Sequence, residues 1–272
     1  MPSLTPSPTP LNPSSAATDD RLLALDPPHR WLLLAESRAF SEYALCVATA
    51  PLRLRWPRGD GHPVITLPGL GASDRSMRPM RRLLRHLGYF AHGWKQGLNR
   101  GRPEAEDGLL ARVRNLYRRH GQPVSLVGWS MGGLYAREVA KRAPEAVRQV
   151  ITLASPFTGH PFASNALTAY RWLSRRALEI EPRWFSFREP PPVPTTSIYS
   201  RSDGIVHWRC TLNPPHPQAE NIRIEASHFG IGHHPLAFFA IADRLAQPAQ
   251  AWRPFRPQGL TRHLFPEPDR GE

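Results

Sequence analysis

Lysine and cysteine are scarce in this chain of 272 residues. Only Lys95 and Lys141 among its 35 basic residues are lysines, and the others are arginines. The two cysteines, Cys46 and Cys210, allow at most one disulfide bond and lie in no CxxC or metal-type cluster, so we expect neither a disulfide scaffold nor a metal site. A mean hydropathy of −0.43 and 21% charged residues exclude an integral membrane protein.

Acidic residues are also few: 22, against 35 basic residues, which gives a net charge of +13. A sequence pI near 11 is typical of proteins that bind nucleic acid or anionic membranes. The arginines are spread over the whole chain, however, and form no basic stripe interleaved with aromatic residues. We therefore expect no nucleic-acid partner, whereas peripheral contact with a membrane stays open.

The two ends of the chain differ from its middle. Residues 1–20 contain five prolines among Ser and Thr, with no basic start or apolar core, so they predict a disordered tail rather than a secretory signal, and a cytoplasmic protein. Residues 21–60 predict an N-terminal helix, at about 28–50, and a linker; this helix should pack against the domain or lie on a membrane surface. Residues 248–272, rich in Pro and Arg, predict a loosely held tail.

Between these ends, short apolar runs alternate with amphipathic helical patterns. The length suits one large α/β domain, which we place at 61–247. The alternation predicts a mostly parallel, doubly wound sheet with helices on both faces. Strands are expected at 64–67, 89–94, 123–129, 150–153, 196–199 and 222–224, and helices at 75–87, 104–120, 131–142 and 235–246. Residues 156–194 break the rhythm with seven aromatic residues.

A G-x-S-x-G sequence lies between the strand predicted at 123–129 and the helix predicted at 131–142. It reads Gly128-Trp129-Ser130-Met131-Gly132. Small residues on both sides of the serine permit a sharp strand-to-helix turn that presents the hydroxyl above the sheet. This motif makes Ser130 a candidate nucleophile; the alternative is a glycine-rich turn with an incidental serine.

A serine hydroxyl needs a base, and the base needs an orienting carboxylate. Asp203 follows the strand predicted at 196–199, and His228 follows the strand predicted at 222–224. Because the carboxyl ends of parallel strands share one edge, we expect both to lie near Ser130. The alternative for Asp203 is that it only caps an Asp-Gly turn. His233 and His234 compete with His228 but precede the proline that starts the last helix, so His228 is preferred.

Acyl transfer also requires donors for the oxyanion of the tetrahedral intermediate. The Met131 amide, in the first turn after the nucleophile, is one candidate. The Leu70 amide, in the glycine-rich loop after the strand at 64–67, is the second. A plain glycine turn is the alternative for that loop.

Four segments in this order resemble the α/β-hydrolase superfamily, above all its bacterial triacylglycerol lipase and esterase-like members, over about residues 61–247. They are Pro68-Gly69-Leu70-Gly71, the elbow motif with Gly133, Ser202-Asp203-Gly204-Ile205-Val206 and Ser227-His228-Phe229-Gly230. The resemblance implies serine ester hydrolysis through an acyl-enzyme, no cofactor, and a small helical cap between the sixth and seventh strands, a place that residues 156–194 occupy. A serine at the elbow argues against members that cleave epoxides or carbon–halogen bonds, which carry aspartate there.

Three functions are compatible with these residues. The first is hydrolysis of carboxylic esters with an apolar acyl group, small-molecule or lipid, through a Ser130-His228-Asp203 triad. The second is an acyltransferase or thioesterase with the same triad, favoured by a site that admits an alcohol and excludes water. The third is a non-catalytic protein that binds a membrane or a partner; three triad residues in order at strand ends weigh against it.

Overall fold

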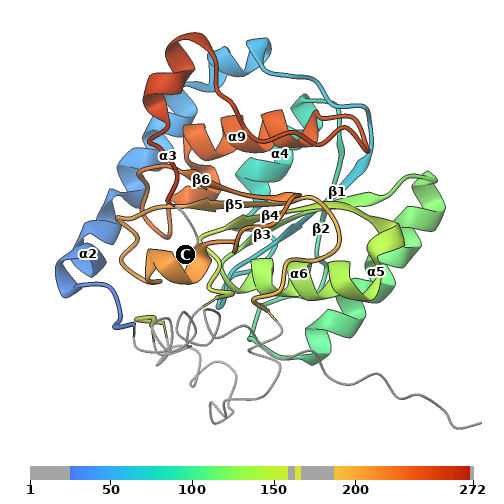
Figure 1. Ribbon diagram of the computed structural model, residues 1–272, viewed down its shortest axis with the longest axis horizontal. Helices are drawn as coiled ribbons and strands as arrows, with labels where there is room; N and C mark the ends of the chain where they lie inside the picture. The colour runs from blue at the N-terminus through green and yellow to red at the C-terminus, as the bar shows by residue number, and fades with distance from the viewer. Residues whose placement is uncertain (1–24, 159–162, 167–186, 270–272) are drawn as a thin grey trace, which may run out of the picture.

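The sheet at the centre of the protein has six strands (Figure 1). The computed structural model describes residues 25–158, 163–166 and 187–269. The strands are β1 (Pro63–Leu67), β2 (Phe90–Gly93), β3 (Val124–Trp129), β4 (Val147–Leu153), β5 (Thr195–Tyr199) and β6 (Ala219–Arg223). They lie in the order β2-β1-β3-β4-β5-β6, and every neighbouring pair is parallel. This confirms the predicted parallel α/β sheet.

Helices cover both faces of the sheet (Figure 1). On one face lie α4 (Arg78–His86) and α9 (Pro235–Leu245), and on the other α5 (Glu104–His120) and α6 (Met131–Arg142). Each face has its own apolar core: in β1, Val64 belongs to the α4–α9 core, while Ile65 and Leu67 belong to the α5–α6 core. A strand buried on both faces must be apolar almost throughout, which is why its short apolar run predicted it.

The charged residues of α5 are distributed as the helix dipole favours. Three acidic residues occupy its first turn and three basic residues its last, an arrangement that the helix dipole stabilises. The helix ends at Gly121, which adopts a left-handed conformation with φ 64°. Four short 3-10 helices lie in the described part of the chain after α6: η3 (Pro144–Ala146), η4 (Trp208–Thr211), η5 (Ile231–His233) and η6 (Gly259–Leu264).

The N-terminal helix predicted at 28–50 consists of three pieces: α2 (Arg30–Ala35), η1 (Glu36–Arg38) and α3 (Ala39–Ala48), followed by η2 (Ala50–Arg55). The segment packs against the domain, but with its polar side. Glu36 and Glu42 are buried, whereas Trp31 and Phe40 are 70% and 84% exposed. The polar side packs because backbone amides of the domain bind the two carboxylates.

The C-terminal segment is held by specific contacts, which corrects the prediction of a loose tail for its described part, residues 248–269. Phe255 and Phe265 pack on Phe239 of α9, with ring centroids 6.4 and 6.0 Å away. Asp269 binds the Tyr199 hydroxyl, with 2.8 Å between the oxygens, and the Arg201 guanidinium. Aromatic burial and a partly buried carboxylate thus outweigh the Pro and Arg content from which looseness was inferred.

Two other predicted segments lie wholly or mostly outside the described residues. These are the tail at 1–20 and the cap at 156–194, of which 156–158, 163–166 and 187–194 are described. The cap falls between β4 and β5, the fourth and fifth described strands. In the described ranges, every helix is too short or too polar to cross a bilayer.

Candidate active site

Ser130 joins β3 to α6 with a backbone conformation that is rare for residues other than glycine. Its φ is 52° and its ψ −123°. Such strain persists only where the surroundings enforce it. The Ser130 amide donates to Leu153 O, 2.8 Å away, and a Cβ on Gly132 would lie 2.5 Å from Leu67 O. A Cβ on Gly128 would lie 2.5 Å from the Gly133 backbone, so the elbow has no room for larger residues at these positions.

The structure brings Ser130, Asp203 and His228 together at the carboxyl edge of the sheet. His228 Nε2 lies 3.1 Å from Ser130 Oγ, and His228 Nδ1 lies 2.7 Å from Asp203 Oδ2. The three residues follow β3, β5 and β6, whose carboxyl ends share that edge. A nucleophile, a base and an orienting carboxylate at these distances can activate a hydroxyl for attack.

Asp203 has two tasks. Its Oδ1 accepts from the amides of Ile205 and Val206, each 2.8 Å away, and its Oδ2 faces His228. The two sequence-based interpretations are therefore compatible: Oδ1 caps the turn, and Oδ2 is left to face the imidazole.

His228 is held on several sides. Only 3% of it is exposed, and its carbonyl accepts from the indole of Trp129, 2.9 Å away. Burial lowers its pKa, but the charge of Asp203, the hydrogen bond to it and the charge of Glu36 outweigh burial, so its pKa is raised above the ordinary value. The competing histidines have other contacts: His233 reaches Ala39 O, and His234 caps α9.

The loop proposed to hold one oxyanion donor passes directly over the elbow. A Cβ on Gly69 would lie 3.2 Å from Ser130 Cβ, and Gly71 has φ 69°. Leu70 lies between these glycines, and Met131 opens α6, where the first amides have no partner within the helix. Asn99 fixes the loop, because its Nδ2 donates to Pro68 O, 2.8 Å away, and its own backbone pairs with Gly71 and Ala72.

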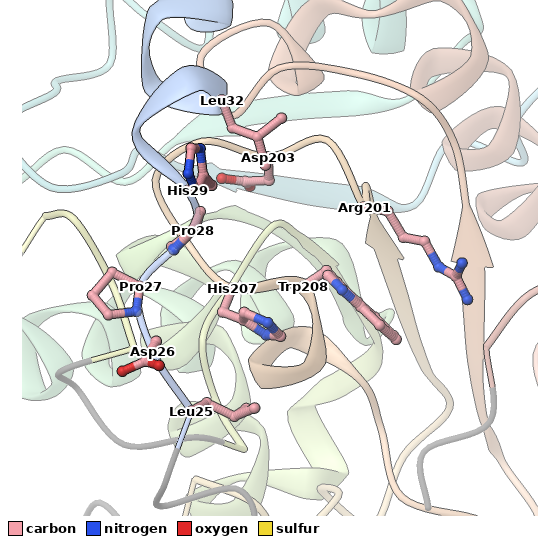
Figure 2. A pocket seen from close by; sticks show the side chains of 10 residues that line it. All are labelled: Leu25, Asp26, Pro27, Pro28, His29, Leu32, Arg201, Asp203, His207 and Trp208. Atoms are coloured by element: carbon pink, nitrogen blue, oxygen red, sulfur yellow. The ribbon is translucent and has the colours of Figure 1, made fainter.

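A pocket of about 400 Å³ adjoins Asp203. Figure 2 shows that its walls come from residues 25–32 and from the loop at 201–208. Its lining is mixed, with Asp26, His29 and His207 beside Leu25 and Trp208, and Ser130 does not line it. It is therefore not an apolar pocket that opens at Ser130. Within the described ranges, no three His, Cys, Asp or Glu side chains group as a metal site would need.

Comparison with known proteins agrees with the fold. Residues 52–270 match the model of the alpha/beta hydrolase family. The chain belongs to this family. Over 124 residues it is 32% identical to the triacylglycerol lipase of Pseudomonas fragi, an alignment that covers 40% of this chain and 39% of the lipase.

Solved structures of two lipases share the fold. Lipase B of Aspergillus fumigatus superposes with a TM-score of 0.56 at 19% identity, over 70% of this chain and 54% of the lipase. The mature lipase BlEst2 of Bacillus licheniformis superposes with a TM-score of 0.53 at 20% identity, over 70% of this chain and 94% of the lipase. At these identities the likeness concerns the α/β-hydrolase fold alone.

Sequence reasoning missed four polar residues of the site. Asn99, which is buried and binds Pro68 O, lies outside every motif that the sequence analysis singled out. Asp74 accepts from the Trp94 and Lys95 amides and so anchors the chain shortly before Asn99. Glu36 and Glu42 belong to a segment that was set apart from the domain. For these two the one available signal was the interruption of an apolar helix by charge.

Proposed function

We propose that this α/β hydrolase cleaves carboxylic esters, with Ser130 as nucleophile, His228 as base and Asp203 as the residue that orients it. One observation carries the proposal. The His228 ring bridges Ser130 Oγ and Asp203 Oδ2 at 3.1 and 2.7 Å, and the serine lies in a strained elbow.

The chemistry follows from these contacts. Ser130 Oγ attacks the ester carbonyl carbon while His228 Nε2 takes the hydroxyl proton. The tetrahedral intermediate collapses, the bond to the alcohol oxygen breaks, and His228 returns the proton to the leaving alcohol. Water, deprotonated by His228, then attacks the acyl-enzyme and releases the acid and Ser130. Asp203 keeps the proton of neutral His228 on Nδ1 and stabilises the imidazolium.

The Leu70 and Met131 amides are proposed as donors to the oxyanion. Removal of one such donor typically costs about 3–4 kcal/mol of transition-state stabilisation. The rigid loop that Asn99 ties above Ser130 supports Leu70 in this role, since a donor acts best when its position is fixed before the reaction.

We propose that the substrate is an ester with an apolar acyl group, lipid esters included. The lipase relative and the seven aromatic residues of the cap stretch support an apolar acyl site.

The proposal extends to peripheral contact with an anionic lipid surface. The segment 30–54 exposes nine large apolar side chains and no acidic residue, because both of its glutamates are buried. An apolar groove of about 540 Å³, lined by Phe40, Tyr43 and Phe229, continues this surface to the neighbour of His228. Net charge of +13 favours an anionic surface. The exposed apolar side chains are Trp31, Leu33, Leu34, Phe40, Tyr43, Leu45, Val47, Leu52 and Leu54.

Hydrolysis is tested with p-nitrophenyl esters of two to sixteen acyl carbons, alongside fluorophosphonate labelling of the wild type and Ser130→Ala. We expect a labelled, active wild type and a variant that is folded but neither labelled nor active. An unlabelled wild type would refute the nucleophile assignment. Labelling without hydrolysis would refute hydrolysis and favour acyl transfer to another acceptor.

Membrane contact is tested by sedimentation with vesicles of phosphatidylglycerol or of phosphatidylcholine. We expect binding to the anionic vesicles and its loss in the double variant Trp31→Ser/Phe40→Ser. Phe90→Ser is the matched control, since Phe90 is 57% exposed on the edge strand β2. Equal loss in both variants, or no binding by the wild type, would refute a docking face at 30–54.

A further inference from the structure

Two buried carboxylates reach the site from outside the sheet. Glu36 and Glu42 lie on η1 and α3, before β1, and are 5% and 8% exposed. A charged side chain is rarely buried to this extent unless it is paired or hydrogen-bonded. Both glutamates bind backbone or hydroxyl groups of the loops that follow β5 and β6, and Glu42 also pairs with Arg38 Nε, 3.3 Å away.

Glu36 joins the loop of Asp203 to the loop of His228. Its Oε1 accepts from the Gly204 amide at 2.8 Å and from the His228 amide at 3.0 Å. Its Oε2 accepts from the Phe229 amide at 3.0 Å. One carboxylate thus binds the amide of Gly204, next to the candidate orienting residue Asp203, and the amide of the candidate base His228.

Glu42 binds Ser227, the residue that precedes His228. Its Oε1 accepts from the Ser227 amide at 2.8 Å, and its Oε2 accepts from the Ser227 hydroxyl at 2.6 Å. Arg38, between the two glutamates, donates to the carbonyl and hydroxyl of Ser202 at 2.7 and 2.8 Å. Three side chains of the segment, from η1 and α3, therefore bind the residues that flank Asp203 and His228.

The loops approach the segment so closely that only glycine fits at two points. A Cβ on Gly204 would lie 2.3 Å from Leu32 O, and a Cβ on Gly230 would lie 1.5 Å from Glu42 Oε2. Both glycines occur in the motifs that suggested a triad. Their backbone is thus shaped by the N-terminal segment as well as by the turn each of them makes.

We propose that Glu36 is a positioning residue of the active site, which fixes the loop of Asp203 against the loop of His228 and so sets the contact between these two side chains. The inference rests on the proposed function for its catalytic consequence. The imidazole can orient on Asp203 only if both loops hold their separation, and Glu36 is bonded to the backbone of both.

The negative charge of Glu36 has a second effect, on the pKa of His228. The charged and titratable groups packed around the His228 loop include Asp203, Glu36, Glu42 and Arg38, and His233 and His234 follow in the chain. Burial lowers the pKa of His228, whereas Asp203 and, to a smaller extent, the negative charge of Glu36 raise it. The charge of Glu36 therefore stabilises the imidazolium that forms when Ser130 loses its proton.

The test compares Glu36→Gln with Glu220→Gln. Glu220 lies at the opposite end of β6 and accepts from Thr196 Oγ1, Arg244 and the Phe255 amide, so it is a matched carboxylate away from the site. In Glu36→Gln the amide nitrogen faces a backbone donor and the charge is lost. We expect kcat to fall about 10- to 100-fold with little change in KM, and the acidic limb of kcat/KM to move to lower pH.

NMR titration of the His228 imidazole gives a readout that needs no substrate. We expect its pKa to be lower in Glu36→Gln than in the wild type and unchanged in Glu220→Gln. If no ester is hydrolysed but this shift is seen together with a changed Nδ1–H resonance of His228, which reports its hydrogen bond to Asp203, the positioning stands and the proposed function fails. Wild-type kcat and His228 pKa in Glu36→Gln, with a loss of Tm alone, would overturn the proposal.

Glu36→Asp keeps the inference testable if Glu36→Gln does not fold. It retains the charge but shortens the reach by one methylene, so the carboxylate can no longer bind both loops. A lower kcat with a His228 pKa close to that of the wild type is expected. Wild-type kcat in this variant would show that the bridge between the loops does not matter.

Discussion

His62 Nε2 lies 2.8 Å from Ser125 Oγ, closer than His228 Nε2 lies to Ser130 Oγ, at 3.1 Å. Asp60 Oδ1 in turn lies 2.5 Å from His62 Nδ1, so the protein holds two Ser-His-Asp arrangements. The second lies at the amino edge of the sheet, where His62 precedes β1 and Ser125 belongs to β3. Distances between three side chains therefore do not identify the nucleophile.

Exposure and backbone conformation separate the two serines. Ser125 and His62 are both 0% exposed, and Ser125 lies inside strand β3 without the positive φ of Ser130. Ser130 is half-buried and lies in a strained turn at the carboxyl edge. A substrate can reach only a hydroxyl that a surface or a pocket presents, so we interpret the arrangement around Ser125 as structural.

Ser125→Ala is therefore predicted to leave hydrolysis and fluorophosphonate labelling at the level of the wild type. It removes one buried hydrogen bond to His62 and should cost about 1 kcal/mol of unfolding free energy. Mass spectrometry of the labelled peptide should locate the label on Ser130 in both proteins. Loss of labelling in a folded Ser125→Ala protein would contradict the assignment.

Asp203→Asn is predicted to lower kcat by about 10³- to 10⁴-fold, because an amide would favour the wrong tautomer of His228. The paired control is Asp60→Asn, in which the same change is made beside His62. Its kcat should stay within about twofold of the wild type, since His62 does not face Ser130. Steady-state kinetics on one ester decides this, and equal losses in both variants would point to a general effect on the fold.

The activity of the wild type is predicted to fall on the acid side as His228 takes up a proton. Only the neutral imidazole can accept the proton of Ser130. The pKa of His228 is raised above 6.5, so the acidic limb of kcat/KM should lie above that pH. A profile of kcat/KM from pH 5 to 9 measures it; a limb well below 6.5 would mean that another group limits the rate.

Stability is predicted to fall as the pH drops below about 6.5. Burial and nearby cationic groups lower the pKa of His92 to about 4, and burial lowers that of His62. A histidine whose pKa is lower in the folded state contributes stability above its unfolded pKa and loses it as pH falls toward the folded value. His228, with a raised pKa, acts in the opposite direction.

Thermal unfolding from pH 8 to 4 measures this dependence. His92→Gln should weaken it, because glutamine carries no titrating group, while His216→Gln, at an exposed turn, should not. A Tm that is flat between pH 7 and 5 in the wild type would contradict the prediction.

The parts of the fold that were predictable are those in which local pattern and global position agree. β1 is buried on both faces, and so its run of apolar residues is nearly continuous. The elbow could be predicted from the sequence because a strained serine needs small neighbours in a fixed order. Asp203 and His228 were found because each follows a strand at an edge they must share.

The residues that were missed depend on partners far away in the chain. Glu36 interrupts an apolar helix, and such a charge usually faces solvent. Its carboxylate accepts hydrogen bonds from amides that lie 168 and 192 residues later in the chain. A local sequence pattern cannot predict partners at that separation. The C-terminal segment was misjudged for the same reason, because its composition favours a loose chain while Phe239 and Tyr199 supply its anchors.

Asn99 is the remaining test of how the oxyanion loop is held. It is 0% exposed, and its side chain both donates to Pro68 O and accepts from the Gly101 amide. Asn99→Ala would leave these groups unpaired and free the loop that carries Leu70. We expect kcat to fall by up to about 100-fold with a small change in KM, because the donor would be displaced from the developing oxyanion.

Asn221→Ala is the control for this variant. Asn221, on β6, exchanges two hydrogen bonds with the backbone of Asn213. Truncation of Asn221 therefore removes comparable polar contacts away from the elbow. Both variants should lose Tm, but only Asn99→Ala should lose kcat. Since labelling by a fluorophosphonate also develops charge on an oxygen beside Ser130, its rate should fall in parallel. An unchanged labelling rate in Asn99→Ala would assign the oxyanion contact to other amides than that of Leu70.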